Sequence, residues 1–215
     1  MFYEPLRGDH GLPHDPFKSC VVPRPIGWIS TVDVDGRRNL APYSFFSAVS
    51  WVPPMVAFAS TGRSTRDGSC KDTLANVEAT GEFVVNMATA ELAGAVNLSS
   101  SDLVPGADEF KLAGVEAIPS RLVRAPRVAV SPIALECRLF QIVPLPSGST
   151  HRPNALAIGE VVGVHIADHL LVDGRIDIGR LRPVARLGYH DWAVIDEAFA
   201  LAPPPLTGAR RRTPA

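Results

Sequence analysis

The sequence predicts a mostly β protein, an antiparallel barrel with many turns and a few short helices. Short apolar runs recur along the chain, and clusters of turn-forming residues separate most of them. The 20 prolines and 17 glycines fall mostly between these runs rather than inside them. Stretches typical of strands also outnumber those typical of helices. This pattern favours a turn-rich antiparallel barrel over a parallel α/β sheet.

The length and composition of the chain limit the classes of protein to which it can belong. With 215 residues it can bury a complete core, so we expect one domain over residues 1–202. Residues 203–215 have no apolar period and contain an arginine run, which is typical of a flexible tail. A formal charge of −1 gives no basic excess for nucleic acid. No stretch approaches the ~20 apolar residues of a membrane span, and the N-terminus lacks signal-peptide features, so we expect a cytoplasmic protein with no membrane partner.

The predicted strands begin with a β-meander over residues 26–60. Asp35-Gly36 separates two apolar runs there, and glycine supplies the positive φ that a tight two-residue hairpin turn needs. Strands are also expected at FVVNM (residues 83–87), at 130–145 and at 155–171, with a short one at Arg186–Val194. We expect helices near 71–79 and at 89–98, the second with Thr89 as its N-cap residue.

The block GRSTRDGSCKDT, residues 62–73, combines hydroxyl and cationic side chains immediately before the first predicted helix. A helix N-terminus presents unpaired N–H groups and a positive dipole end, so this block predicts an anion site, typically for phosphate. A solvated polar loop capped by Asp72 or Thr73 explains the same residues equally well. The Walker pattern G-x-x-x-x-G-K-[ST] is absent.

The segment NLAPYSFFSAVS, residues 39–50, mixes polar side chains with Tyr43, Phe45 and Phe46. A flat heteroaromatic ring needs an apolar or aromatic slot and a few polar groups at its edge, and this segment could supply both. Aromatic residues in strands are more often part of a core, and that alternative stays open on this segment alone.

Three runs occur in order along the chain: RPIGWISTVDVDGRRNLAPYSFFSAVS, CKDTLANVEATGEFVVN and RLGYHDW. In order and approximate spacing they resemble the flavin-reductase-like, FMN-binding family, whose fold is a split β-barrel with Greek-key antiparallel strands. The resemblance covers roughly residues 17–195, and its first two motifs are the specific ones. It implies a homodimer in which the two protomers complete each other's flavin sites.

The resemblance also implies a position for FMN, across the barrel and near the dimer interface. The ring and ribityl chain would lie along Asn39, Ala41, Pro42, Tyr43 and Ser44. The phosphate would be surrounded by Ser60, Thr61, Arg63, Lys71, Asp72 and Thr73. Arg24 and Pro25 would approach from the preceding loop. The polar block and the aromatic segment would then hold two ends of one ligand.

The histidines and cysteines give no metal site. His165 and His169 are four residues apart, but the segment reads as a strand and no third ligand is nearby. Cys20, Cys70 and Cys137 are odd in number and widely separated, so we expect neither a disulfide framework nor zinc. In a reductase of this family, His190 in RLGYHDW or His165 could help to seat a nicotinamide, although a structural role is the simpler interpretation of each.

No G-x-G-x-x-G follows a strand and opens a helix, so the sequence contains no Rossmann unit. NADH or NADPH would therefore stack transiently on the flavin and deliver hydride to its N5 atom. The implied function is an NAD(P)H-dependent flavin reductase that needs no obligatory catalytic side chain and passes electrons to a flavin-dependent oxygenase or another acceptor. The alternatives are an FMN-binding carrier or partner protein without appreciable NAD(P)H oxidation, and a heme- or F420-binding relative.

Overall fold

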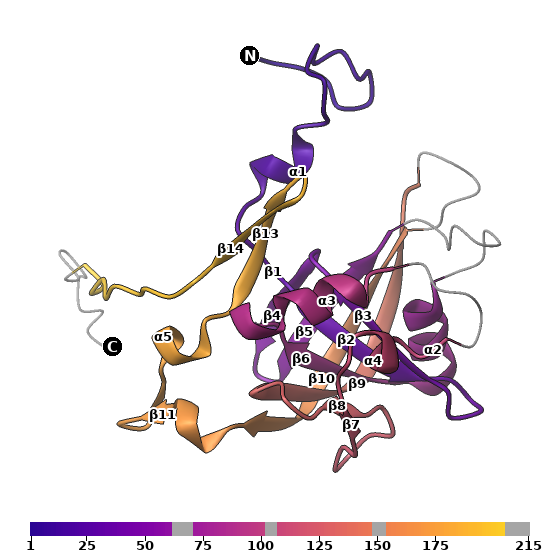
Figure 1. Ribbon diagram of the computed structural model, residues 1–215. Coiled ribbons are helices and arrows are strands. Elements are labelled where there is room, and N and C mark those ends of the chain that lie inside the picture. Colours follow the sequence, from indigo (N-terminus) through magenta and orange to yellow (C-terminus); the bar gives the residue numbers. More distant parts are fainter. Residues whose placement is uncertain (62–70, 102–106, 148–153, 205–215) are drawn as a thin grey trace, which may run out of the picture.

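The computed structural model of the chain describes residues 1–61, 71–101, 107–147 and 154–204. Its centre is a seven-stranded antiparallel sheet in the order β3-β2-β6-β9-β10-β5-β4 (Figure 1). The strands are β2 (Gly27–Val32), β3 (Arg38–Tyr43), β4 (Phe46–Trp51), β5 (Pro54–Ser60), β6 (Glu82–Met87), β9 (Ile133–Leu145) and β10 (Asn154–Ile166). The prediction of a mostly β, antiparallel fold with short helices is confirmed.

The sheet curls until its two edge strands approach each other. β3 and β4 are the opposite edges of the sheet, yet only Ser44 and Phe45 separate the end of one from the start of the other. A two-residue connection cannot cross a flat seven-stranded sheet, because neighbouring strands are about 4.8 Å apart. The edges therefore meet at this connection without a ladder between them, which is the split of the barrel.

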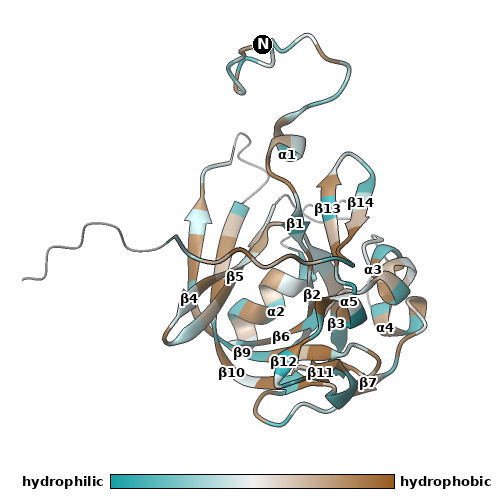
Figure 2. Ribbon diagram, turned by 90° about the vertical axis from the view of Figure 1, so that its left-hand side faces the viewer, coloured by the Kyte–Doolittle hydropathy of each residue, from teal (hydrophilic) through white to brown (hydrophobic). Residues whose placement is uncertain are grey.

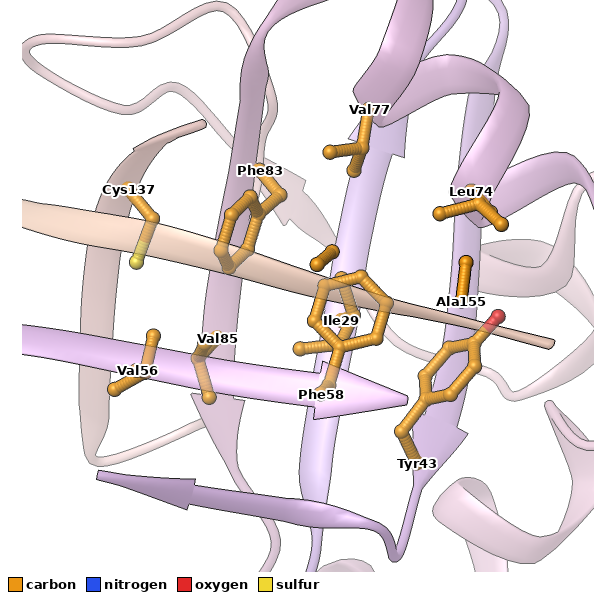
Figure 3. Packing of buried hydrophobic residues seen from close by; sticks show 11 residues of the cluster. Ile29, Tyr43, Val56, Phe58, Leu74, Val77, Phe83, Val85, Cys137 and Ala155 are labelled. Carbon is orange, nitrogen blue, oxygen red and sulfur yellow. The ribbon is translucent and has the colours of Figure 1, made fainter. Parts of the chain in front are cut away.

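The barrel core is formed by inward-pointing side chains of the strands and is closed on one side by α2 (Asp72–Thr80). Figure 3 shows Phe58 between the rings of Tyr43 and Phe83, with centroid distances of 4.9 and 5.4 Å. Leu74 and Val77 on α2 point into the same cluster. All six residues of β2 are buried, because α2 and the helices α3 (Ala93–Leu98) and α4 (Glu109–Leu112) cover parts of the sheet.

A second, three-stranded sheet projects from the barrel and combines a strand from the N-terminal part of the chain with two from the C-terminal part (Figure 1). It consists of β1 (Arg24–Pro25), β13 (Val184–Gly188) and β14 (Asp191–Val194), and α1 (Phe17–Cys20) packs beside β13. We call these four elements the arm. Figure 2 shows α1 above the β13–β14 hairpin, with the N-terminal residues extending beyond it.

The remaining elements are short and lie outside the barrel. They are η1 (Ala90–Leu92), α3 (Ala93–Leu98), α4 (Glu109–Leu112), β7 (Ala117–Ile118), β8 (Arg127–Val128), η2 (Asp168–Leu170), β11 (Leu171–Val172), β12 (Arg175–Ile176) and α5 (Ile178–Leu181). Trp28 and Leu40 lie in a second buried cluster between the sheet and α3 and α4.

Several predicted elements are confirmed and others need correction. The helix near 71–79 is α2, which ends at Gly81 with φ of 70°. The helix predicted at 89–98 is divided into η1 and α3, and Thr89 is its N-cap without a side-chain cap bond. The strand predicted at 155–171 ends at Ile166, where η2 follows.

Two turn predictions were wrong in detail. The Asp35-Gly36 hairpin exists, but Val32 pairs with Arg38, so the connection is longer than two residues. Only Gly36 has a positive φ there, whereas a tight type I′ turn requires two such residues. The single strand predicted at Arg186–Val194 is the β13–β14 hairpin, because Gly188 and Tyr189 both adopt a positive φ and reverse the chain.

Candidate functional site

A cavity of about 680 Å³ lies between the arm and the end of the barrel where β3 passes into β4. Its volume is within the range usual for small-molecule and cofactor sites. The residues that line it come from widely separated parts of the sequence: Asp15, Lys18, Arg24, Ile26, Pro42, Tyr43, Ser44, Phe45, Ala59, Thr61, Lys71, Asn97, Ser100, Arg186, Tyr189 and Trp192.

The barrel wall of the cavity is the connection between β3 and β4. Tyr43 ends β3, and its ring is fixed against Phe58 in the core, so it presents a rigid edge to the cavity. Ser44 and Phe45 follow in the short connection, whose position is fixed by the hydrogen bond from Ala59 N to Phe45 O of 2.8 Å. The split of the barrel thus places aromatic and hydroxyl groups together at one surface.

A second wall is formed by Thr61 and by Lys71 at the start of α2. Lys71 is the N-cap residue, with φ −62° and ψ 140°, and its side chain accepts no bond from the helix N–H groups. The nine-residue helix begins at Asp72, directly after this lysine, so the positive dipole end of α2 and the Lys71 ammonium group lie together beside the cavity. This arrangement fits an anion such as phosphate. Arg63, which we also expected at the phosphate, lies outside the described residues.

Asn39 and Thr73, both expected to contact flavin, are bound to each other and do not line the cavity. Asn39 Nδ2 donates to Thr73 Oγ1 at 2.8 Å and to Thr31 Oγ1 at 3.3 Å. Asn76 Nδ2 donates to Thr31 Oγ1 at 3.0 Å, so these buried groups form one network between α2 and the β2–β3 hairpin. The network fixes the start of α2 against the barrel, which positions Lys71.

The other expected flavin residues are placed beside the cavity but not on its wall. Ser60 is buried at the end of β5, and Ala41 packs against the barrel core. Asp72 is the first residue of α2, and Pro25 is in β1. Of the residues expected at the flavin, Arg24, Pro42, Tyr43, Ser44, Thr61 and Lys71 line the cavity.

The arm wall of the cavity brings two arginines together, Arg24 and Arg186. The sequence predicted only Arg24 as a residue of the site. Arg24 and Arg186 are direct partners in the β1–β13 ladder. The Arg24 guanidinium lies 5.8 Å from the Phe45 ring centroid, and that of Arg186 lies 5.2 Å from the Trp192 ring centroid. Burial lowers the pKa of Arg24, and the like charge of Arg186 lowers it further. The cationic side chains that line the cavity, Lys18, Arg24, Lys71 and Arg186, exceed the single carboxylate of Asp15.

Neither histidine singled out in the sequence lines the cavity. His190 is exposed at the tip of the β13–β14 hairpin, and its neighbour Tyr189 occupies the wall instead. His165 lies on β10, where its Nε2 is 2.5 Å from Oε1 of the buried Glu136. The motif RLGYHDW therefore contributes Arg186, Tyr189 and Trp192 to the cavity. Its mixture of cationic and aromatic residues is the feature of the sequence that could have identified them as binding residues.

Lys18, the α3 residue Asn97 and Ser100, which follows α3, were also missed, since no motif marks them and only the folded chain brings them to the cavity. In the described ranges no helix has the length and apolar character to cross a bilayer. The described side chains also contain no group of three His, Cys, Asp or Glu residues that could hold a metal ion.

A family model for the flavin reductase like domain matches residues 19–182, which make up most of the chain. An uncharacterised protein of Halalkalibacterium halodurans is 39% identical over 192 residues, or 89% of this chain and 90% of that protein. Nitrilotriacetate monooxygenase component B from Bacillus cereus has a solved structure with 32% identity and a TM-score of 0.83, covering 94% of this chain and 98% of that one.

A further solved structure, 2-nitrobenzoate 2-nitroreductase from Pseudomonas fluorescens, is 28% identical with a TM-score of 0.76, covering 89% of this chain and 90% of that one. The family match ends before RLGYHDW, so the third motif of the resemblance lies outside it. The first two motifs lie within it, together with both barrel-side walls of the cavity. The chain belongs to the flavin-reductase-like family of split-barrel proteins.

Proposed function

We propose that the protein binds FMN in the cavity between barrel and arm and acts as an NAD(P)H-dependent flavin reductase. The observation that carries this proposal is the combination of Lys71 and the α2 N-terminus with the aromatic connection between β3 and β4 on one cavity. An anion site beside a flat aromatic surface fits a ligand that has a phosphate at one end and a ring system at the other.

In this proposal Lys71 and Thr61 hold the phosphate, with Arg63 as an additional candidate from the preceding block. Pro42, Tyr43 and Ser44 lie along the ring and ribityl chain, with Phe45 beside them. Asn39 and Thr73 act indirectly, because their hydrogen-bonded network holds α2 in place. Ala41, Ser60 and Asp72 remain part of the proposed site as residues that flank its walls.

When bound, FMN supplies an acceptor at N5 for hydride from NADH or NADPH. The residues of the chain orient the ring, exclude water from its barrel side and place positive charge around the cavity. Tyr43 is rigid because it packs on Phe58, so it can define the plane in which a ring binds. The nicotinamide donor would bind only transiently, because the sequence contains no Rossmann unit to hold it. No side-chain acid or base is required for this step.

The unit that carries this function is proposed to be one domain over residues 1–202, located in the cytoplasm and acting as a homodimer. Its exposed edge strand β4 supports the dimer, since Val49 and Trp51 on the strand and Val52 directly after it are 54%, 90% and 82% exposed. An apolar edge of this kind is usually covered in solution. Because the Bacillus cereus relative is a component of a monooxygenase, we propose a flavin-dependent oxygenase as an electron acceptor.

The test of flavin binding compares FMN with riboflavin, which lacks the phosphate. Lys71→Ala should weaken FMN binding by about 1.5–3 kcal/mol, the contribution of a charge-assisted hydrogen bond, and leave riboflavin binding almost unchanged. Lys111→Ala, an exposed lysine of α4 that does not line the cavity, is the matched control. Equal losses for both ligands would show that Lys71 does not contact phosphate.

The test of turnover adds NADH or NADPH to the FMN-loaded protein without oxygen and follows the visible absorption of the flavin. Rapid bleaching is expected for a reductase. Full flavin occupancy without bleaching by either nicotinamide would contradict reductase activity and favour the alternative, an FMN-binding carrier or partner protein. Failure to take up FMN at all would contradict both functions.

A further inference from the structure

The arm end of the cavity contains binding groups that the phosphate and ring of FMN do not use in the arrangement above. Lys71 lies at the start of α2 and Thr61 directly follows β5, whereas Arg186, Tyr189 and Trp192 lie on the β13–β14 hairpin. Figure 1 shows α2 and this hairpin at opposite sides of the barrel end. The cavity therefore has two separate cationic ends.

Two guanidinium groups face each other at the arm end without a carboxylate between them. Arg24 and Arg186 are cross-strand partners, and like charges directly opposite in a ladder are destabilising. Among the described residues neither of them takes part in an ion pair. A bound anion would remove this repulsion, and paired arginines are well suited to phosphate oxygens.

Arg24 is held in place as part of a built site. It is only 6% exposed, and its Nη1 donates to the backbone carbonyls of Lys18 and Val21, the latter at 2.7 Å. Its Nε is buried with no hydrogen-bond partner. Buried N–H groups of charged side chains are rarely left without a partner, so this unpaired donor on a side chain that lines the cavity indicates a missing acceptor.

Arg186 is oriented by two contacts of its own. Its Nη2 donates to Tyr189 O at 2.6 Å, and its guanidinium lies over the Trp192 ring. Tyr189 adopts φ of 44°, which is unfavourable for a bulky residue, and its side chain is 47% exposed where it lines the cavity. Strained backbone that presents an exposed aromatic ring is characteristic of ligand sites.

We propose that the arm end of the cavity binds the adenosine diphosphate part of a dinucleotide. The pyrophosphate lies between Arg24, Arg186 and Lys18, and the adenine ring stacks on Tyr189. This inference rests on the proposed function, which supplies one dinucleotide of this chemistry, the nicotinamide donor. A second is FAD, which has the flavin ring of FMN and an ADP part. It assigns substrate recognition to the motif RLGYHDW, which the family match does not include.

The experiment titrates ADP into the full-length, FMN-loaded protein by calorimetry, with adenosine as a second ligand. Arg186→Gln should weaken ADP binding about 10- to 100-fold and adenosine binding little, because it removes charge-assisted bonds to phosphate. Arg186→Lys should retain part of the ADP affinity. Tyr189→Leu should weaken both ligands about 2- to 10-fold. Arg175→Gln, an exposed arginine on β12, is the matched control.

The two ends of the cavity can be distinguished by exchanging ligands and variants. Lys71→Ala should weaken FMN binding and leave ADP binding unchanged, while Arg186→Gln should do the reverse. If Arg186→Gln weakens FMN but not riboflavin, the arm holds the flavin phosphate and the inference is wrong. If the protein binds FMN but no ADP, the inference also fails, although the proposed flavin function survives. Failure to bind FMN would instead overturn the proposed function.

Two further comparisons identify the dinucleotide. If the donor occupies the site, Arg186→Gln should raise KM for NADH and leave that for reduced nicotinamide riboside, which has no ADP part, unchanged. If FAD occupies it, FAD should bind more tightly than FMN, and Arg186→Gln should remove the difference. Absence of both effects would overturn the inference.

Discussion

The barrel and the arm are stabilised in different ways. Every residue of β2 in the barrel is buried, whereas neither α1 nor β14 of the arm contains a buried residue. The arm instead depends on the β1–β13 ladder, on Arg24 and on the close contact between α1 and Gly188. The barrel can therefore maintain a rigid site, while the arm is free to carry polar and strained residues. Changes in the barrel should affect folding, and changes in the arm should affect ligand binding.

The largest effect is expected from Phe83→Ala in the barrel. Phe83 is fully buried and contacts Phe58, and Gly159 lies so close that a Cβ there would approach the Phe83 ring to 2.4 Å. Removing the ring should lower the free energy of unfolding by about 3–5 kcal/mol, measured by denaturant titration. Phe140→Ala on β9, where the side chain is 66% exposed, is the control. A loss below about 1 kcal/mol would show that the core collapses around the cavity.

A smaller loss is expected from Glu136→Gln on the outer side of the barrel. The Glu136 carboxylate is fully buried and accepts bonds from Arg121 N at 2.8 Å, Leu122 N at 2.6 Å and His165 Nε2 at 2.5 Å. A glutamine has an NH₂ group in place of one carboxylate oxygen. A donor would then face the donors that this oxygen accepts from, and their hydrogen bonds would be lost. The substitution should therefore cost about 2 kcal/mol of stability at neutral pH.

The same carboxylate predicts how stability depends on pH. Desolvation, the largest influence, raises the pKa of Glu136, but the hydrogen bonds from Arg121, His165 and Leu122 outweigh it, so the pKa lies below its ordinary value of 4.5. Because its pKa is lower in the folded than in the unfolded state, the Glu136 carboxylate stabilises the fold above pH 4.5. This contribution is lost as the pH falls through the folded-state pKa. Stability of the native protein should decline in acid more steeply than that of Glu136→Gln. Glu160→Gln, exposed on β10, should retain the native slope.

The smallest effect on stability, but a clear one on ligand binding, is expected from Gly188→Ala in the arm. A Cβ at Gly188 would lie 2.1 Å from Ser19 Oγ and 3.0 Å from Ser19 Cα, and φ there is 120°. The substitution should displace α1, cost about 1–2 kcal/mol and weaken ADP binding. Gly174→Ala is the control, because it has φ of 73° but open space around it. If both variants bind ADP equally well, the contact with α1 does not shape the site.

The sequence predicted the barrel better than it predicted the arm. The alternation and turn residues of 26–60 indicate β2 to β5 because strand period and turn chemistry are local properties. The start of α2 was also predicted from its neighbours in sequence. The β13–β14 hairpin was mistaken for one strand, since Tyr189 adopts a positive φ that no propensity favours.

The candidate site divides in the same way. Tyr43, Ser44 and Lys71 were identified because each lies in a continuous motif. Asn39 and Thr73 were expected at the ligand, but their hydrogen bond directs them to each other. Whether such a side chain turns to a cavity or to a neighbour depends on contacts between α2 and β3, which are distant in sequence.

The sequence alone determined that the chain forms an antiparallel β protein and which segments alternate as strands, and it predicted where an anion could meet a helix. These properties depend on near neighbours along the chain. Only the tertiary structure decided that β3 and β4 meet as the two edges of one curled sheet, and that Arg24 faces Arg186. Pairings between distant strands are set by the packing of the whole molecule, and the two-ended cavity depends on them.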